Sequence, residues 1–85
     1  MSDAIDLIFA ELRKAEKKHP TWPTDKIHVA GIVGEEAGES MQAAIDIEYG
    51  NPGADIEKMK IELAQTGAMA IRALVAILKE QEDEE

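Results

Sequence analysis

The segment from about residue 54 to Lys79 constrains the fold more than any other part of the chain. Its apolar residues recur at helical spacing and cover more than half of the helix circumference: Ile56, Met59, Ile61, Leu63, Ala68, Ala70, Ile71, Leu74, Val75, Ile77 and Leu78. A helix that is apolar this far round is buried on several sides. Two other helices of similar length hardly suffice to cover it, so we expect a homo-oligomer.

Two further segments have helical patterns. The first runs from about Asp3 to Lys18 and carries apolar residues at helical spacing. The second follows Thr24, which we expect to cap it, and ends at Tyr49, directly before Gly50. Because no segment has the alternating pattern of a strand, we predict an all-α fold. Its form is a short antiparallel helical bundle completed by homo-oligomerisation.

The length of 85 residues indicates a single domain. A chain this short buries only about 60–65% of its unfolded surface, so its core is marginal, and oligomerisation is a common remedy. We place one helical domain at residues 1–79 and an acidic C-terminal tail at residues 80–85. The tail is expected to serve solubility or to be disordered.

Charge and composition exclude several classes of protein. The net charge of −9 argues against a general binder of nucleic-acid polymers, which needs a basic face. It does not exclude a nucleotide, because bound metal ions neutralise phosphates locally. There is no cysteine for a disulfide, a thiolate zinc site or a nucleophile. The N-terminus does not resemble a signal peptide, and the most apolar run, Leu63 to Leu78, is shorter than the roughly 20 residues of a membrane span. We therefore expect a cytoplasmic protein without membrane contact.

Three carboxylates occur within five residues of the second segment: Glu35, Glu36 and Glu39. At about 100° per residue, Glu36 points away from Glu35 and into a sector that is otherwise apolar. Charged groups rarely enter an apolar face unless they are paired or bind a metal. Glu36 and Glu39 are three residues apart, which is near enough for both to hold one ion.

The third segment has a matching polar stripe over an arc of roughly 120°: Lys58, Glu62, Gln65, Thr66, Met69 and Arg72. Two antiparallel helices that offer Glu36, Glu39 and Glu62 would form an all-oxygen site for Mg²⁺, Mn²⁺ or Ca²⁺. Such a site stabilises charge on a phosphoryl centre and activates a water molecule. The spacing alone is equally compatible with an acidic surface and an ordinary Lys58–Glu62 surface pair.

Three other features have both a structural and a functional interpretation. Trp22, the only tryptophan, packs over the helix ends in the favoured interpretation and stacks on a nucleobase in the other. The basic residues between Arg13 and Lys18 either complement the helix dipole or attract phosphate. Gly31, Gly34 and Gly38 share one stripe of the second segment, which favours a tight helix crossing over direct ligand contact.

Residues 35–39, with the sequence Glu-Glu-Ala-Gly-Glu, resemble the EExxE signature of the MazG-like all-α nucleoside triphosphate pyrophosphohydrolases. In that family an ExxD motif follows on the next helix. Here Glu62 follows Glu39 after twenty-two residues, and Gln65 stands where the motif has aspartate. Residues that flank both motifs also resemble small phage-type or mobile-element members, so the resemblance spans about residues 22–78.

The resemblance implies hydrolysis of a (deoxy)nucleoside triphosphate to the monophosphate and pyrophosphate, with Mg²⁺ or, in its place, Mn²⁺. Water attacks between the α and β phosphates. The implied metal ligands are Glu36, Glu39 and Glu62, and Glu35 is implied as a further ligand or as the residue that orients the attacking water. The resemblance also implies a homodimer or homotetramer and a house-cleaning role, the removal of unwanted nucleotides.

Gln65 is the departure from the motif. A neutral amide oxygen can ligate Mg²⁺, but it brings no charge and cannot act as a base. Asp46 is a poor substitute, because it lies seven residues, or about 10 Å, from Glu39 along the helix.

Four residues are our candidates for contacts with the substrate: Lys58, Gln65, Arg72 and Trp22. The basic edge from Arg13 to Lys18 is a further candidate for the phosphates. Two alternatives to an enzyme stay open. One is a regulatory module that binds a nucleotide and a metal without turnover, which Gln65 favours. The other is a structural helical oligomer, which the apolar third segment favours.

Overall fold

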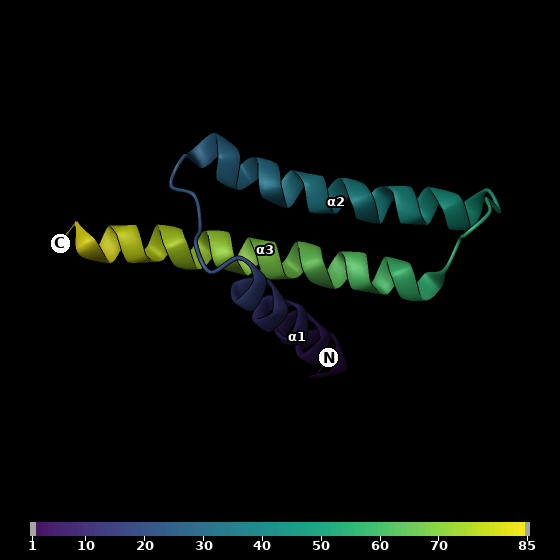
Figure 1. Ribbon diagram of the computed structural model, residues 1–85, viewed down its shortest axis with the longest axis horizontal. Helices are drawn as coiled ribbons and strands as arrows, with labels where there is room; N and C mark the ends of the chain where they lie inside the picture. Colours follow the sequence, from purple (N-terminus) through teal and green to yellow (C-terminus); the bar gives the residue numbers. More distant parts are fainter. Residues whose placement is uncertain (1, 85) are drawn as a thin grey trace.

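The computed structural model describes residues 2–84, and all regular structure in that range is helical (Figure 1). The helices are α1 (Ser2–Lys18), α2 (Lys26–Glu48) and α3 (Ile56–Asp83). Helices α2 and α3 form a long antiparallel hairpin, and α1 crosses α3 on the side away from α2. The predicted all-α fold is confirmed, with α3 as the helix that contacts both others.

Aspartate caps fix the starts of α2 and α3. The Asp25 carboxylate accepts a hydrogen bond of 2.9 Å from the backbone N–H of His28, so the expectation that Thr24 caps α2 is wrong by one residue. The Asp55 carboxylate accepts a bond of 3.0 Å from the N–H of Glu57. Each cap satisfies an N–H group that the first turn of the helix leaves without a partner.

The predicted end of α2 before Gly50 is confirmed. Gly50 has a φ of 65°, a left-handed conformation that glycine adopts without strain. Its N–H donates to the carbonyl of Ile47, and the N–H of Asn51 donates to the carbonyl of Asp46 at 2.9 Å. This pair of bonds is a Schellman motif, which turns the chain toward α3.

Helix α3 continues to Asp83, four residues beyond the predicted end at Lys79. Most of the predicted tail is therefore helical rather than disordered. Glu80 also pairs with Lys26, with 2.6 Å between Oε2 and Nζ, and so joins the last turns of α3 to the first turn of α2. Both side chains are largely exposed, so this pair contributes at most about 1 kcal/mol.

The core is small for a chain of this length. The buried residues within the described range are Val29, Ala43, Ala64 and Ala68. The chain exposes 6299 Å², whereas a folded monomer of this mass exposes about 5,000 Å². Its radius of gyration is 14.6 Å, against about 12 Å for a compact domain of the same length. The single chain is therefore extended and under-packed.

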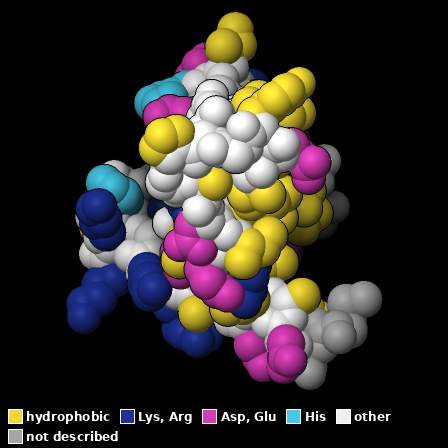
Figure 2. All heavy atoms as spheres, turned by 90° about the vertical axis from the view of Figure 1, so that its right-hand side faces the viewer, with side chains coloured by type: hydrophobic (Ala, Val, Ile, Leu, Met, Phe, Trp, Pro, Cys, Tyr) yellow, Lys and Arg dark blue, Asp and Glu magenta, His cyan; other side chains and the backbone are white. Residues whose placement is uncertain are grey.

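Large apolar side chains remain uncovered, and half of those in the described range lie on α3: Ile56, Ile61, Leu63, Leu74, Val75, Ile77 and Leu78. Figure 2 shows hydrophobic side chains gathered on one side of the molecule and Lys and Arg side chains on the other. The apolar run from Leu63 to Leu78 is by itself shorter than a membrane span. By length and composition, α3 as a whole could cross a membrane, a property that core helices of soluble proteins share.

The glycine stripe of α2 faces open space. A Cβ atom at Gly31, Gly34 or Gly38 would meet no atom within 4 Å, so the tight crossing expected there does not occur within the described chain. The close approach is elsewhere. A Cβ at Gly67 of α3 would lie 3.1 Å from Ile8 Cδ1 of α1. Glycine at position 67 therefore lets α1 lie directly against α3.

Candidate metal centre

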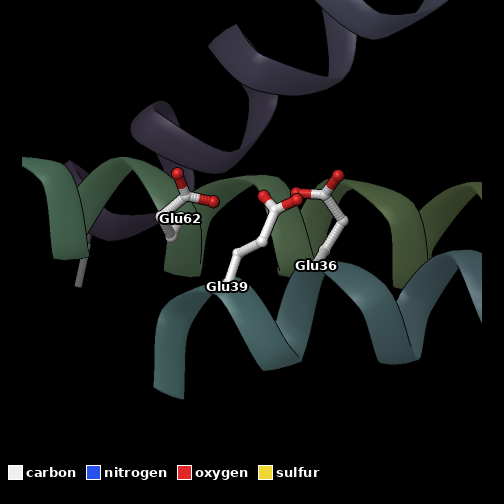
Figure 3. Close-up of side chains that lie close together, drawn as sticks. All are labelled: Glu36, Glu39 and Glu62. Atoms are coloured by element: carbon white, nitrogen blue, oxygen red, sulfur yellow. The ribbon is translucent and has the colours of Figure 1, made fainter. Parts of the chain in front are cut away.

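Three carboxylates converge where α2 packs against α3 (Figure 3). Glu36 and Glu39 come from adjacent turns of α2, and Glu62 comes from α3. One oxygen of each lies within 4.8 Å of the others. Two ligands on opposite sides of one ion are separated by about 4.2 Å for Mg²⁺ and about 5 Å for Ca²⁺. A single hard cation can therefore contact all three after small side-chain movements.

Two oxygens of this cluster are shielded from solvent and have no hydrogen-bond partner within the protein: Glu36 Oε2 and Glu62 Oε2. The free-energy cost of leaving a buried polar atom unpaired is about 1–3 kcal/mol, and more when the group is charged. A cation or a proton would remove this cost. Both side chains are otherwise half-buried, so solvent ions can reach the cluster.

The electrostatics of the cluster also favour the binding of a cation or a proton. Burial raises the pKa of Glu36, and the negative charges of Glu39 and then Glu35 raise it further. Burial also raises the pKa of Glu62, and the nearby carboxylates of Glu39 and Glu36 raise it further, while Lys58 lowers it. Without a cation, Glu36 and Glu62 therefore hold a proton more readily than an ordinary glutamate does.

Two of the predicted residues lie at the edge of the cluster. Glu35 is exposed and is not one of the three residues with converging oxygens, although its charge reaches Glu36. Lys58 is exposed and acts electrostatically on both Glu62 and Asp46. Among the described residues it forms no salt bridge, so the surface pair with Glu62 is not formed here. The roles predicted for Glu35 and Lys58 stay predictions.

Gln65 faces helix α1. Its Nε2 donates a 3.2 Å hydrogen bond to Glu11 Oε1, and Glu11 Oε2 in turn lies 3.1 Å from Lys14 Nζ. Sequence reasoning missed Glu11, because the contact joins residues 54 positions apart. The sequence did indicate that Glu11 lies at the edge of the apolar face of α1, because it is three residues after Ile8 and four before Ala15.

Two hollows adjoin Glu36. One has a volume of about 310 Å³ and is lined by Glu11, Lys14, Ala15, Lys18, His19, Glu36, Gln65, Met69 and Arg72. The other, of about 350 Å³, is lined by His19, Thr21, Trp22, Pro23, Ile32, Glu36, Met69 and Arg72. The first hollow thus has an acidic wall beside the cluster and lysines from the basic edge of α1. The second has several apolar side chains around a tryptophan.

Arg72 fixes the loop between α1 and α2. Its guanidinium donates to the backbone carbonyls of Ala15, His19 and Thr21, the shortest of these bonds being 2.7 Å to His19. It also lies 4.6 Å from the centre of the Trp22 ring, a cation–π contact. Trp22 therefore packs beside the end of α1, as the favoured interpretation expected. The contacts predicted for Arg72 with phosphate and for Trp22 with a base remain predictions.

Comparisons with known proteins give no match: none was found among protein-family models, curated proteins or solved structures. The likeness to the pyrophosphohydrolase family therefore rests on the sequence motif alone.

Proposed function

We propose that the protein is a Mg²⁺-dependent nucleoside triphosphate pyrophosphohydrolase of the MazG-like type. It would convert a (deoxy)nucleoside triphosphate into the monophosphate and pyrophosphate. The observation that carries the proposal is the convergence of Glu36, Glu39 and Glu62, with two unpartnered oxygens, beside a hollow that also contains lysines.

The donor set suits a hard divalent cation. It consists of carboxylate oxygens alone, and Mg²⁺ and Mn²⁺ prefer oxygen ligands. Glu36, Glu39 and Glu62 would hold the ion, whose remaining positions suit water and phosphate oxygens. When bound, the ion supplies charge that stabilises the phosphoryl centre and makes a water molecule more acidic. Glu35 is proposed to orient the attacking water.

The two hollows offer complementary surroundings for the parts of a nucleotide. Lys14 and Lys18 line the first hollow together with Glu36, so a polyphosphate can lie between the cation and the lysines. Trp22 and Ile32 line the second, which suits the apolar faces of a nucleobase. We therefore propose that the α1 edge binds the phosphates and that Arg72 holds the loop.

We further propose that the active form is a homodimer or homotetramer in the cytoplasm. The chain exposes roughly 1,300 Å² more than a folded monomer of its mass, and a standard interface buries about 800 Å² on each partner. A second copy against α3 would cover this excess. A bilayer is the less suitable environment for α3, because Glu62 and Arg72 place charges along its apolar part. Each charge at the centre of a span costs at least about 2.5 kcal/mol.

Light scattering on the native chain and on Leu74→Glu tests the assembly. Leu74 is 59% exposed in the single chain, so the new charge should dissociate the oligomer without entering the core of the chain. A monomeric native protein at micromolar concentration would contradict the proposal. Flotation of the native chain with lipid vesicles would favour a membrane instead.

A regulatory module that binds nucleotide without turnover is the second candidate. It is favoured by Gln65, a neutral amide at the position where the family motif has aspartate. This candidate predicts a Mg²⁺-dependent thermal shift with a nucleotide but no product. The third candidate, a structural helical oligomer, is favoured by the uncovered α3 face and predicts neither effect.

Pyrophosphate release from the common ribo- and deoxynucleoside triphosphates, with Mg²⁺ or Mn²⁺, tests the reaction. Glu39→Gln removes a proposed ligand, and Glu48→Gln is a matched control, because Glu48 is exposed at the end of α2. We expect release by the native protein and the control and almost none by Glu39→Gln. Equal release by Glu39→Gln would exclude the proposed site.

A further inference from the structure

Helix α1 brings an additional carboxylate to the edge of the acidic cluster. Glu11 accepts the hydrogen bond from Gln65 Nε2 at 3.2 Å, and its side chain is only 12% exposed. Glu11, Gln65 and Glu36 line the same hollow of about 310 Å³. The contact thus joins α1 to the part of α3 that lies beside the proposed metal ligands.

The chemistry of the pair determines which way the amide of Gln65 faces. A glutamine side chain has a donor end and an acceptor end of nearly equal shape, whereas an ionised carboxylate can only accept. Glu11 therefore binds the NH₂ end of Gln65 and leaves its carbonyl oxygen free of this bond. Lys14 Nζ lies 3.1 Å from the second oxygen of Glu11 and forms an ion pair with it.

We propose, on the basis of the proposed metal-dependent function, that Glu11 is a positioning residue that acts through Gln65. By holding the NH₂ group, it directs Gln65 Oε1 toward the cation bound by Glu36, Glu39 and Glu62. The amide then serves as a neutral oxygen that binds the ion directly or accepts a hydrogen bond from its water. The site combines three charged oxygens with one neutral oxygen whose direction is fixed by another helix.

This role also predicts the effect of placing an acid at position 65. In Gln65→Glu the new carboxylate would face Glu11, and two carboxylates in contact repel each other or share a proton. The gain of a charged ligand would therefore be lost in the single variant. Adding Glu11→Gln restores a hydrogen bond with reversed polarity. The double variant should bind a divalent cation at least as tightly as the native chain.

Binding of Mn²⁺ alone, followed by electron paramagnetic resonance, tests the inference without requiring turnover. We expect Glu11→Gln and Gln65→Ala each to weaken Mn²⁺ binding by about 10-fold, the lower end of the range for residues that orient metal ligands. The effects should not add, because Glu11 acts only through Gln65. Glu11→Asp, which keeps the charge but shortens the side chain, should resemble Glu11→Gln. Glu16→Gln on the same helix is the matched control.

The outcomes separate this inference from the proposed function. Unchanged Mn²⁺ binding in Glu11→Gln, or equal losses with and without Gln65, would overturn the positioning role. Normal Mn²⁺ binding with no pyrophosphate release from any nucleotide would instead overturn the hydrolase and leave the positioning role measurable. Absence of Mn²⁺ binding by the native chain would overturn both. Circular dichroism and melting temperature, unchanged within a few degrees, show that each variant is folded.

Discussion

The acid at the turn end of the α2–α3 hairpin and the acids near its middle have opposite surroundings. Asp46 accepts hydrogen bonds of 3.0 Å from Gln42 Nε2 and from Asn51 Nδ2. The pKa of Asp46 is lowered, chiefly by the bond from Asn51 and then by that from Gln42. Glu36 and Glu62 have an unpartnered buried oxygen each and acidic neighbours, and their pKa values are raised.

This difference separates a structural acid from a candidate ligand. Amide donors already stabilise the negative charge of Asp46, which supports the turn after α2 and gains little from a cation. The charge at Glu36 and Glu62 lacks such donors and must be balanced by a proton or by an ion. The residue type is therefore less informative than the partners that the fold provides.

The largest expected contrast is in catalysis. Glu39→Gln should reduce pyrophosphate release about 100-fold or more, because it removes a proposed ligand and with it the charge that holds the ion. Asp46→Asn should stay within about threefold of the native rate, since Asp46 lies outside the cluster. The rates measured with the preferred nucleotide at saturating Mg²⁺ check this. A similar loss of pyrophosphate release in both variants would contradict the distinction between Asp46 and the acids of the cluster.

Stabilisation by the metal should show the second largest contrast. At a Mg²⁺ concentration of about 100 times Kd, binding adds about 2.7 kcal/mol to the free energy of unfolding, or a melting-temperature increase of roughly 15 °C for a chain of this size. We expect Glu36→Gln and Glu62→Gln to lose most of this increase and Asp46→Asn to retain it. Differential scanning fluorimetry with and without EDTA provides the measurement. A full shift in Glu62→Gln would remove that residue from the site.

Without a cation, the two kinds of acid should respond to mutation with opposite sign. Glu36→Gln removes a half-buried charge and its repulsion with Glu39 and Glu35, so it should raise the melting temperature in EDTA by a few degrees. Asp46→Asn removes the charged acceptor of two hydrogen bonds and should lower it. Melting curves at pH 7 in EDTA compare the two. A lower melting temperature for Glu36→Gln would show that its carboxylate is already stabilised in the folded chain.

The smallest contrast is in the dependence on pH. The raised pKa values of Glu36 and Glu62 mean that their contribution to stability is present at low pH and is lost as the pH rises through those values. The lowered pKa of Asp46 has the opposite effect, with stability present at neutral pH and lost in acid. In EDTA between pH 7 and pH 5, Glu36→Gln should flatten the pH profile, whereas Asp46→Asn should leave it nearly unchanged. Identical profiles would contradict the electrostatic distinction.

Helical periodicity was sufficient to predict three helices, and together with the resemblance to the EExxE motif it led to the prediction that Glu36, Glu39 and Glu62 lie together. Both depend on local spacing plus one assumption, that consecutive helices joined by a short turn are antiparallel. Helix ends were less predictable. Thr24 and Asp25 are both good caps, and the choice between them is made by backbone conformation rather than by residue type.

Contacts between distant helices could not be predicted from spacing. The Gln65–Glu11 bond depends on the angle and height at which α1 crosses α3, and no local pattern specifies either. For the glycines of α2, by contrast, a contact was predicted that the described chain does not form. Their common stripe was interpreted as a close crossing, yet a small-residue face only permits an approach and does not provide the partner. In the single chain that partner is absent from the described residues.

Gly67 lies where α1 packs closely against α3. A methyl group at this position would lie 3.1 Å from Ile8 Cδ1, so the Ile8 side chain would have to give way by a few tenths of an ångström. Ile8 lies three residues before Glu11 on α1, and the Glu11–Gln65 bond of 3.2 Å is at the long end of the usual range for an N–H···O bond. The missing side chain at Gly67 therefore allows α1 to pack against α3 at the distance at which the acid and the amide meet.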